Sequence, residues 1–336
     1  MNFANIQDLI IGYWKSQVLF TALELGIFEE LAKGAKELNY LADSCKFSPI
    51  SGEQLLTACI SLGLITKEGS VYKNSLETQQ LLVKEAPNYV GNVALHLRDT
   101  IPLWNHLTDA VQENSNRWKQ VTGSEEGHFP SLYKDPKSLE AFVGTMDVYT
   151  KQVAQAVSTN FDFYGYKKIL DVGGSTGLFG NIIIEEYPHL NVTIFDLPKV
   201  CDITEKYIKN KYHKDSNMKT IRGNFLQESL PEGFDVIYLG WVLHDWPPEI
   251  QMQILEKCYQ ALPTGGVVIA TENLLNENKS GPVFTALMSL AMLVATDGGV
   301  ESTGNEYIER FTKAGFKDVK IKELPSMRHM IIGVHP

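Results

Sequence analysis

Hydrophobic positions follow two different patterns along the chain. Up to about residue 85, apolar residues recur every three or four positions, beginning with Phe3, Ile6, Leu9, Ile10, Tyr13 and Trp14. This spacing predicts amphipathic helices. From Lys167 onward, short apolar runs alternate with helical stretches, which predicts strands of an α/β sheet. Residues 86–160 between these regions read as helical and loop-rich, with a loop over 123–130.

The first region predicts three helices and then a hairpin. The first helical pattern runs from Phe3 to Gly26 and beyond, and the second covers 37–44. Ser51 is a suitable N-cap for the third, and Gly63 a suitable stop. Residues 64–72 predict a hairpin that turns at Glu68-Gly69. This order of elements is that of a winged helix.

The second region predicts a doubly wound α/β sheet. Seven strands are expected, at Lys168–Val172, Asn191–Phe195, Lys219–Gly223, Phe234–Leu239, Gly266–Thr271, Val319–Glu323 and His329–Val334. Ligands of such sheets bind outside the carboxyl ends of the strands. The residues that follow each strand are therefore the candidates for function.

Composition and charge exclude several classes of protein. The 336 residues are 44% hydrophobic and carry a net charge of -10, which argues against disorder and against phosphate-rich partners. The third helix contains no Lys or Arg, so the winged helix is not expected to bind nucleic acid. We find no export signal and no apolar run long enough to span a membrane, and we expect a cytoplasmic protein.

The cysteines do not indicate a metal site or a disulfide framework. Cys45, Cys59, Cys201 and Cys258 form no C-x-x-C pair and have no histidines clustered near them. Reduced thiols and no bound metal are the expectation.

A glycine-rich turn follows the first strand of the sheet. Asp171-Val172-Gly173-Gly174-Ser175-Thr176-Gly177 leads into a helix, and Asp196 ends the next strand. A carboxylate there can accept hydrogen bonds from two ribose hydroxyls, so the sequence predicts a nucleoside site. The glycines do not fit G-x-G-x-x-G in either possible frame, which disfavours an NAD-dependent oxidoreductase.

Several motifs together resemble one enzyme family. Ile169–Gly177 and Phe195–Pro198 resemble the cofactor region of plant caffeate and bacterial polyketide small-molecule O-methyltransferases. Trp241–Trp246, Gly298–Thr303 and Ala314–Phe316 resemble later motifs of that family, and Glu24–Phe28 and Ser61–Leu64 resemble its winged-helix dimerisation domain. The resemblance runs from about residue 10 to the C-terminus. It implies a Rossmann-like S-adenosylmethionine-dependent domain over 161–336, a dimerisation domain over 1–85 and a helical linker over 86–160 that contributes to the acceptor pocket.

The resemblance also assigns cofactor residues. It implies contacts from Asp171, Gly173, Gly174, Gly177, Asp196, Leu197, Asn224, Phe225, Gly240, Asp245 and Trp246. Trp246 either packs near the adenine or caps the edge of the sheet. Asn224 stands where the family usually has Asp, and Gly240 where several plant members have Lys. These two departures weaken the assignments at those positions.

The same motifs imply the catalytic residues. Methyl transfer from a sulfonium needs the acceptor aligned and its proton removed. The resemblance implies His244 as general base and carries over Glu272 and Glu301. Either glutamate can orient the imidazole and stabilise the imidazolium.

The sequence gives less information about the residues of the acceptor site. Met146, Phe142, Met288, Met292 and Trp104 are apolar residues on predicted helices, and each either lines the pocket or belongs to the core. The resemblance implies that some of them sandwich a flat acceptor. A family member that binds S-adenosylmethionine without transferring methyl is the main alternative. The apolar face from Phe3 to Trp14 either pairs with a second chain in a homodimer or packs on its own domain.

Overall fold

The chain forms two compact units in the computed structural model, which describes residues 2–125, 134, 136–212, 217–325 and 328–336. The units comprise Met1–Thr100 and Ile101–Pro336. Helix α7 (Gly91–Asp99) therefore belongs to the N-terminal unit. The finer division at residue 85, with a separate linker to 160, stays a prediction. No helix in the described ranges has the length and apolar character needed to cross a bilayer.

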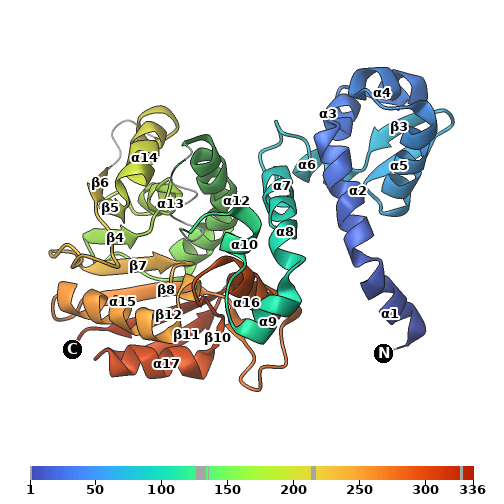
Figure 1. The fold of residues 1–336 in the computed structure, drawn as a ribbon. Coiled ribbons are helices and arrows are strands. Elements are labelled where there is room, and N and C mark those ends of the chain that lie inside the picture. The colour runs from blue at the N-terminus through green and yellow to red at the C-terminus, as the bar shows by residue number, and fades with distance from the viewer. Residues whose placement is uncertain (1, 126–133, 135, 213–216, 326–327) are drawn as a thin grey trace. The chain divides into compact units, whose positions relative to one another are not determined.

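The N-terminal unit has the predicted winged-helix order (Figure 1). Its other elements are α1 (Phe3–Ile10), α2 (Gly12–Glu24), α3 (Ile27–Ala32), β1 (Lys36–Glu37), α4 (Leu38–Cys45), α5 (Pro49–Ser61), β2 (Ile65–Glu68), β3 (Val71–Asn74) and α6 (Leu76–Leu81). The three strands pair antiparallel in the order β1-β3-β2. Phe28, Leu41, Leu56 and Tyr72 are among the side chains buried in its core.

One predicted helix start is wrong. Helix α5 begins at Pro49 with Ser48 as its N-cap, and Ser51 lies inside the first turn, where its hydroxyl donates to the carbonyl of Ser48. Proline has no N–H and a fixed φ, so it favours the first helical position, and this preference outweighs the capping tendency of Ser51. The first helical pattern is divided among α1, α2 and α3. Ile11 separates α1 from α2, and Gly26, in a left-handed conformation, precedes α3.

The C-terminal unit contains the predicted sheet. Its strands are β4 (Lys168–Val172), β5 (Asn191–Asp196), β6 (Met218–Arg222), β7 (Val236–Gly240), β8 (Val267–Glu272), β11 (Lys317–Glu323) and β12 (His329–Val334), within two residues of the predicted bounds. Their order is β11-β12-β8-β7-β4-β5-β6. Strand β12 runs antiparallel to both neighbours and the other pairs, from β8 to β6, are parallel.

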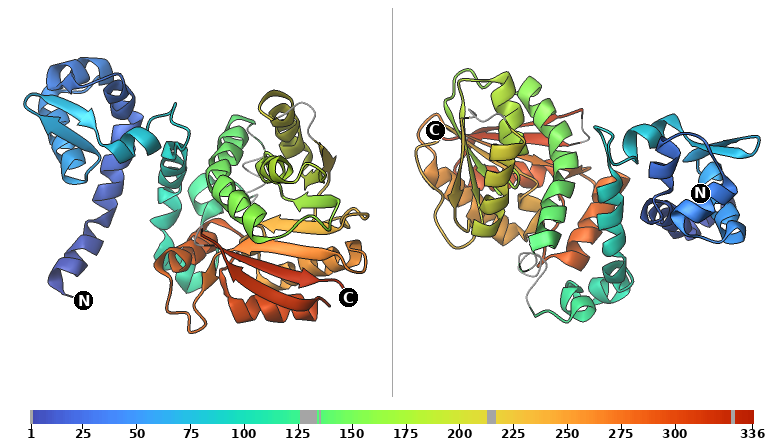
Figure 2. Two further views of the ribbon diagram at one scale, coloured as in Figure 1. Left: turned by 180° about the vertical axis from the view of Figure 1, so that it is seen from behind. Right: turned by 90° about the horizontal axis from the view of Figure 1, so that it is seen from above.

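Helices cover both faces of this sheet. Helices α12 (Pro136–Asn160), α13 (Leu178–Glu186) and α14 (Pro198–Asn210) lie on one face, and α15 (Pro248–Ala261) and α17 (Gly304–Lys313) on the other (Figures 1 and 2). Alternate residues of each strand enter the two cores, as Ile169 and Leu170 do. The direction of winding reverses between β4 and β7, so their carboxyl ends flank the crevice in which doubly wound sheets bind ligands.

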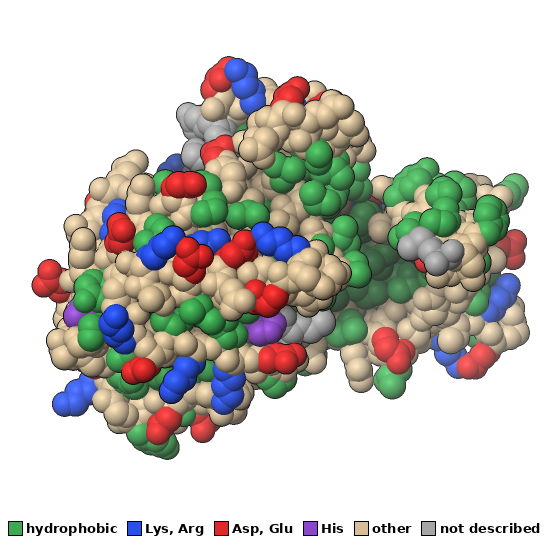
Figure 3. Space-filling view, turned by 90° about the horizontal axis from the view of Figure 1, so that it is seen from below, with side chains coloured by type: hydrophobic (Ala, Val, Ile, Leu, Met, Phe, Trp, Pro, Cys, Tyr) green, Lys and Arg blue, Asp and Glu red, His purple; other side chains and the backbone are tan. Residues whose placement is uncertain are grey.

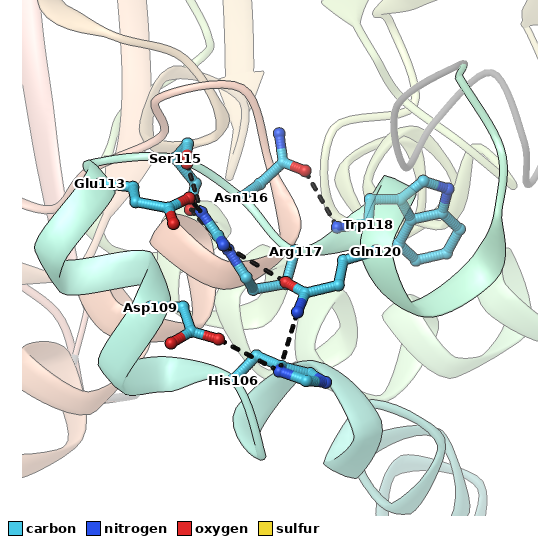
Figure 4. A network of polar contacts seen from close by, with 8 residues as sticks. All are labelled: His106, Asp109, Glu113, Ser115, Asn116, Arg117, Trp118 and Gln120. Atoms are coloured by element: carbon cyan, nitrogen blue, oxygen red, sulfur yellow. Dashed lines mark hydrogen bonds and ion pairs between the residues drawn. The ribbon is translucent and has the colours of Figure 1, made fainter.

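Three short helices pack against α16 (Val283–Ala295) in the same unit. These are α8 (Ile101–Trp104), α9 (Leu107–Glu113) and α10 (Trp118–Thr122). The buried Arg117 joins their corner, because its guanidinium donates to Glu113, Gln120 and the carbonyl of Ser115 (Figure 4). Its backbone N–H donates to the carbonyl of Val294 at 2.9 Å. The corner thus fixes the end of α16. Of the predicted loop at 123–130, residues 126–130 lie outside the described residues.

Candidate active site

The glycine-rich turn connects β4 to α13 through a tight backbone path. Gly173, Ser175 and Gly177 all adopt left-handed conformations. Any other residue at position 174 would force a structural shift, because its Cβ would lie 2.5 Å from the carboxyl group of Asp171. The turn therefore brings the backbone close to a buried acid, and the space beside Gly174 is already filled.

Two buried carboxyl groups stand at this turn. Asp196 accepts hydrogen bonds from the N–H of Ser175 at 3.0 Å and from the N–H of Leu197 at 2.7 Å. Burial raises the pKa of Asp196 to about 6 and that of Asp171 to about 8. Among the described residues, Asp171 Oδ2 and Ser175 Oγ have no hydrogen-bond partner. Since each carboxylate oxygen can accept two bonds, Asp196 retains capacity for the ribose hydroxyls, and the turn fits a nucleoside.

The residues after β6 and β7 close the other side of this turn. Phe225 and Trp246 meet edge to face with ring centroids 6.3 Å apart, and Phe225 also approaches the position of Gly173. The amide oxygen of Asn224 accepts a bond from the N–H of Leu226. At Gly240, a Cβ would lie 2.8 Å from the ring of Tyr238. Any side chain at position 240 would therefore require that ring to move.

The three predicted catalytic side chains meet in the structure. His244 lies on a 3-10 turn, η1 (Leu243–Asp245), directly after β7. Its Nδ1 lies 2.8 Å from Glu301 Oε1, and its Nε2 lies 3.6 Å from Asp245 Oδ1. Glu272 accepts a bond from the N–H of Leu243 at 2.9 Å. His244, Glu272 and Glu301 are all buried, with ligand-type atoms within 4.8 Å of one another.

A pair of two-residue strands holds the two glutamates together. Strand β9 (Leu274–Leu275) pairs parallel with β10 (Ser302–Thr303), with Ser302 opposite Leu274. Glu272 shortly precedes β9 and Glu301 directly precedes β10, so this pairing brings both carboxyl groups to η1. The N–H of Val300 also donates to the carbonyl of His244 at 2.9 Å. The geometry of the cluster therefore depends on segments far apart in the sequence.

The cluster has strongly shifted proton affinities. Burial raises the pKa of Glu272 to about 8 and that of Asp245 to about 6. Burial alone lowers the pKa of His244. The carboxyl groups of Glu301, Asp245 and Glu272 together raise it by more than burial lowers it, so its net pKa lies well above 6.5. Because these groups interact, the cluster titrates as a unit.

Comparisons with known proteins decide the family. A model of the O-methyltransferase domain matches residues 104–317, and a model of the O-methyltransferase dimerisation domain matches residues 7–84. The chain is an S-adenosylmethionine-dependent O-methyltransferase. The predicted family, fold class and cofactor are thereby confirmed.

Relatives of this methyltransferase match it along nearly its full length. The S-adenosyl-L-methionine-dependent methyl transferase PigF of Serratia sp. is 34% identical over 96% of this chain and 93% of its own. The 3-hydroxy-5-methyl-1-naphthoate 3-O-methyltransferase of Streptomyces sahachiroi is 33% identical over 98% and 94%. The solved structure of human N-acetylserotonin methyltransferase with SAM superposes with a TM-score of 0.92, at 29% identity over 99% of this chain and 98% of its own.

The predicted acceptor residues of the methyltransferase lie in different surroundings. Met288 and Met292 are half-buried on α16, and Met146 is half-buried on α12. Phe142 packs against the apolar cluster between α12 and α14, and Trp104 packs into the cluster of α8 and α16. Which of these side chains contact the acceptor stays a prediction.

Sequence reasoning missed a second group of residues beside His244. The Trp241 ring stacks on the His244 ring, with centroids 5.2 Å apart and an angle of 16°. Tyr149 of α12 contacts Trp241 from 5.0 Å, and the guanidinium of Arg328 lies 3.6 Å from the Trp241 centroid. Arg328 precedes β12, and the start of an antiparallel strand lies at the ligand edge of the sheet, where His329 pairs with Glu272. The antiparallel direction of β12 is the feature that could have pointed to Arg328.

Proposed function

We propose that this methyltransferase uses His244 as general base to methylate a hydroxyl of a small, flat aromatic acceptor. The observation that carries the proposal is the buried hydrogen bond between His244 Nδ1 and Glu301. Glu301 accepts from Nδ1–H, so the neutral imidazole has its lone pair on Nε2. In the part of the chain that the structure describes, Nε2 has no hydrogen bond, and Asp245 at 3.6 Å is its nearest ionic neighbour.

The chain's residues have separate tasks in this proposal. S-adenosylmethionine supplies a methyl group activated by the sulfonium charge. Asp196 would hold the ribose hydroxyls, and the backbone of Gly173 and Gly174 would lie against the nucleoside. His244 would accept the acceptor's proton at Nε2, and Glu301 would stabilise the resulting imidazolium.

The raised pKa of His244 gives the proposal a pH dependence. A histidine with a raised pKa is mostly protonated at neutral pH, and the neutral, basic form increases as pH rises. The rate should therefore increase from neutral to alkaline pH, rather than level off just above pH 6.5.

The acceptor class rests on relatives and on the residues of α16. Two of the named relatives act on a hydroxynaphthoate and on N-acetylserotonin, both flat aromatic compounds. Met288 and Met292 have flexible, polarizable side chains that adapt to flat rings. We infer a phenolic acceptor of one or two fused rings.

A His244→Gln variant tests the assignment of the base. Loss of a general base typically costs 10²–10⁴-fold in rate, so turnover of phenolic acceptors with labelled methyl donor should fall by about that factor. S-adenosylhomocysteine should bind within twofold of the wild-type affinity in calorimetry. His189→Gln, at an exposed histidine, is the matched control. Full turnover by His244→Gln would remove His244 as the base.

We also propose that the chain forms a homodimer through its first helices. Phe3, Leu9, Ile10, Tyr13 and Trp14 are each more than half exposed on α1 and the start of α2. Figure 3 shows hydrophobic side chains gathered on this face of the N-terminal unit. Such a strip is costly in water and is typical of an interface. Sedimentation at micromolar concentration should give a dimer, and Leu9→Glu with Tyr13→Glu should give a monomer.

A further inference from the structure

Arg328 is a buried cation without a counter-charge. Its side chain is 6% exposed, and among the described residues its guanidinium makes no hydrogen bond or ion pair. Its contacts are the faces of Trp241 and Tyr149. Burying an unpaired charge is expensive, and buried charges in folded proteins are normally paired. Burial lowers the pKa of Arg328 to about 10, which still leaves it charged at neutral pH.

The acids of the catalytic cluster act on Arg328 from a distance and form no ion pair with it in the described part of the chain. Glu301 is hydrogen-bonded to His244. Glu272 accepts from the N–H of Leu243, and burial raises its pKa to about 8, so it is mostly protonated at neutral pH. Glu272 Oε2 and Glu301 Oε2 have no hydrogen-bond partner among the described residues, yet neither carboxyl group forms an ion pair with Arg328.

A second unpartnered donor lies beside Arg328. The indole N–H of Trp241 is buried and has no hydrogen-bond partner in the described part of the chain. Trp241 is also held at a φ of 57°, a left-handed conformation that costs a non-glycine residue energy and occurs preferentially at functional sites. An unpartnered indole N–H, a guanidinium held only against aromatic rings and a strained backbone thus coincide next to His244.

We propose that Arg328 and the Trp241 indole N–H receive a carboxylate on the aromatic acceptor. The planar guanidinium can bind a carboxylate through two parallel hydrogen bonds. The ring of Trp241 contacts both Arg328 and His244, so one indole connects the carboxylate site to the base. This inference rests on the proposed methylation of a phenolic hydroxyl and names the class of acceptor.

A matched pair of ligands tests the proposal by binding alone. Positional isomers of hydroxynaphthoate, each beside its neutral carboxamide, are titrated calorimetrically into protein saturated with S-adenosylhomocysteine. At least one carboxylate should bind ten or more times more tightly than its carboxamide. Arg328→Met should remove that preference and leave carboxamide affinity within twofold, and Arg328→Lys should retain part of it. Arg222→Met is the control, since Arg222 is exposed and paired with Asp202 and Glu205.

The outcomes separate this proposal from the assignment of the base. Equal affinity for carboxylate and carboxamide, no binding of any carboxylate, or an unchanged preference in Arg328→Met would overturn it. If Arg328→Met does not fold, as judged by circular dichroism, the wild-type ligand pairs and Arg328→Lys still decide. His244→Gln should lose methyl transfer but keep the carboxylate preference. Turnover retained by His244→Gln would overturn the base and leave the carboxylate site standing.

Discussion

The two halves of the ligand edge hold their ionisable side chains in different ways. On the cofactor side, Asp196 is held by backbone N–H groups of Ser175 and Leu197. On the acceptor side, His244 is held by a side chain 57 residues away, and Glu272 by the backbone of η1. The first arrangement follows from the local course of two strands and one turn. The second exists only when distant segments are packed together.

This difference explains how each half tolerates change. A backbone donor is present whatever the side chain, so the N–H at position 175 can hold Asp196 without the Ser175 hydroxyl. On the acceptor side, the pKa of His244 depends on the carboxyl groups of Glu301, Asp245 and Glu272 together, so a change in one of these side chains alters the titration of the cluster. We therefore expect substitutions on the cofactor side to alter affinity, and substitutions on the acceptor side to alter pH dependence.

Asp196→Ala should have the largest effect on the cofactor side. Hydrogen bonds to a charged group contribute about 1.5–3 kcal/mol each, and two ribose hydroxyls would lose them. The affinity for S-adenosylhomocysteine should fall about 100-fold or more in calorimetry, with the pH profile of saturated turnover unchanged. Asp202→Ala, on the exposed side of α14, is the control. A loss below threefold would mean that Asp196 does not hold the ribose.

Glu301→Gln should move the pH profile on the acceptor side. The Glu301 carboxylate raises the pKa of His244, so its neutral replacement lowers that pKa and increases the basic form at a given pH. The rising limb of kcat against pH should shift down by about one unit or more, which corresponds to about 1.4 kcal/mol. Cofactor affinity should not change. An unshifted limb, with Glu309→Gln as the surface control, would show that Glu301 does not set the proton affinity of His244.

Asp171→Asn should have a smaller effect, on stability. The pKa of Asp171 is raised by burial to about 8, above the value of about 3.9 in an unfolded chain. The folded state therefore binds more protons between these values, and this contribution to stability is lost as pH rises towards 8. The neutral amide should flatten that loss, so the variant should melt roughly 2 °C or more above wild type at pH 8 and show no such advantage at pH 5. An equal difference at both pH values would contradict the assignment.

The sequence predicted the sheet and the cofactor turn because their information is local. Each strand is a short apolar run with clear ends, and the acids follow strands directly. Local patterns did not group His244, Glu272 and Glu301. The family resemblance predicted that they act together, since nothing near Glu301 in the sequence indicates its partner. The helix start at Ser51 was wrong because two local signals, a serine and a proline, competed within three residues.

Arg328 and Trp241 were missed for a different reason. The residues that follow a strand lie at the ligand edge only where the strand is one of the parallel set. Strand β12 is antiparallel, so its beginning, not its end, lies at the ligand edge. Two residues of α12 were also missed: Tyr149 contacts Trp241, and Asp147 accepts a hydrogen bond from the hydroxyl of Thr176. Only the tertiary structure reveals these contacts, because no sequence pattern shows where a long helix crosses a sheet.

The pairing of β9 with β10 also bears on how such enzymes can be modified. The two short strands bracket residues 276–301, which include α16 with Met288 and Met292, and they close the ends of that segment next to each other. A segment whose two ends lie side by side can be exchanged without moving the strands that flank it. Residues 276–300 could be replaced by the corresponding stretch of a relative while Glu272, Glu301 and the cofactor turn keep their places. Because Met146 and Phe142 lie on α12, such a graft would change the α16 part of the predicted acceptor site and leave the α12 part and the cofactor side as they are.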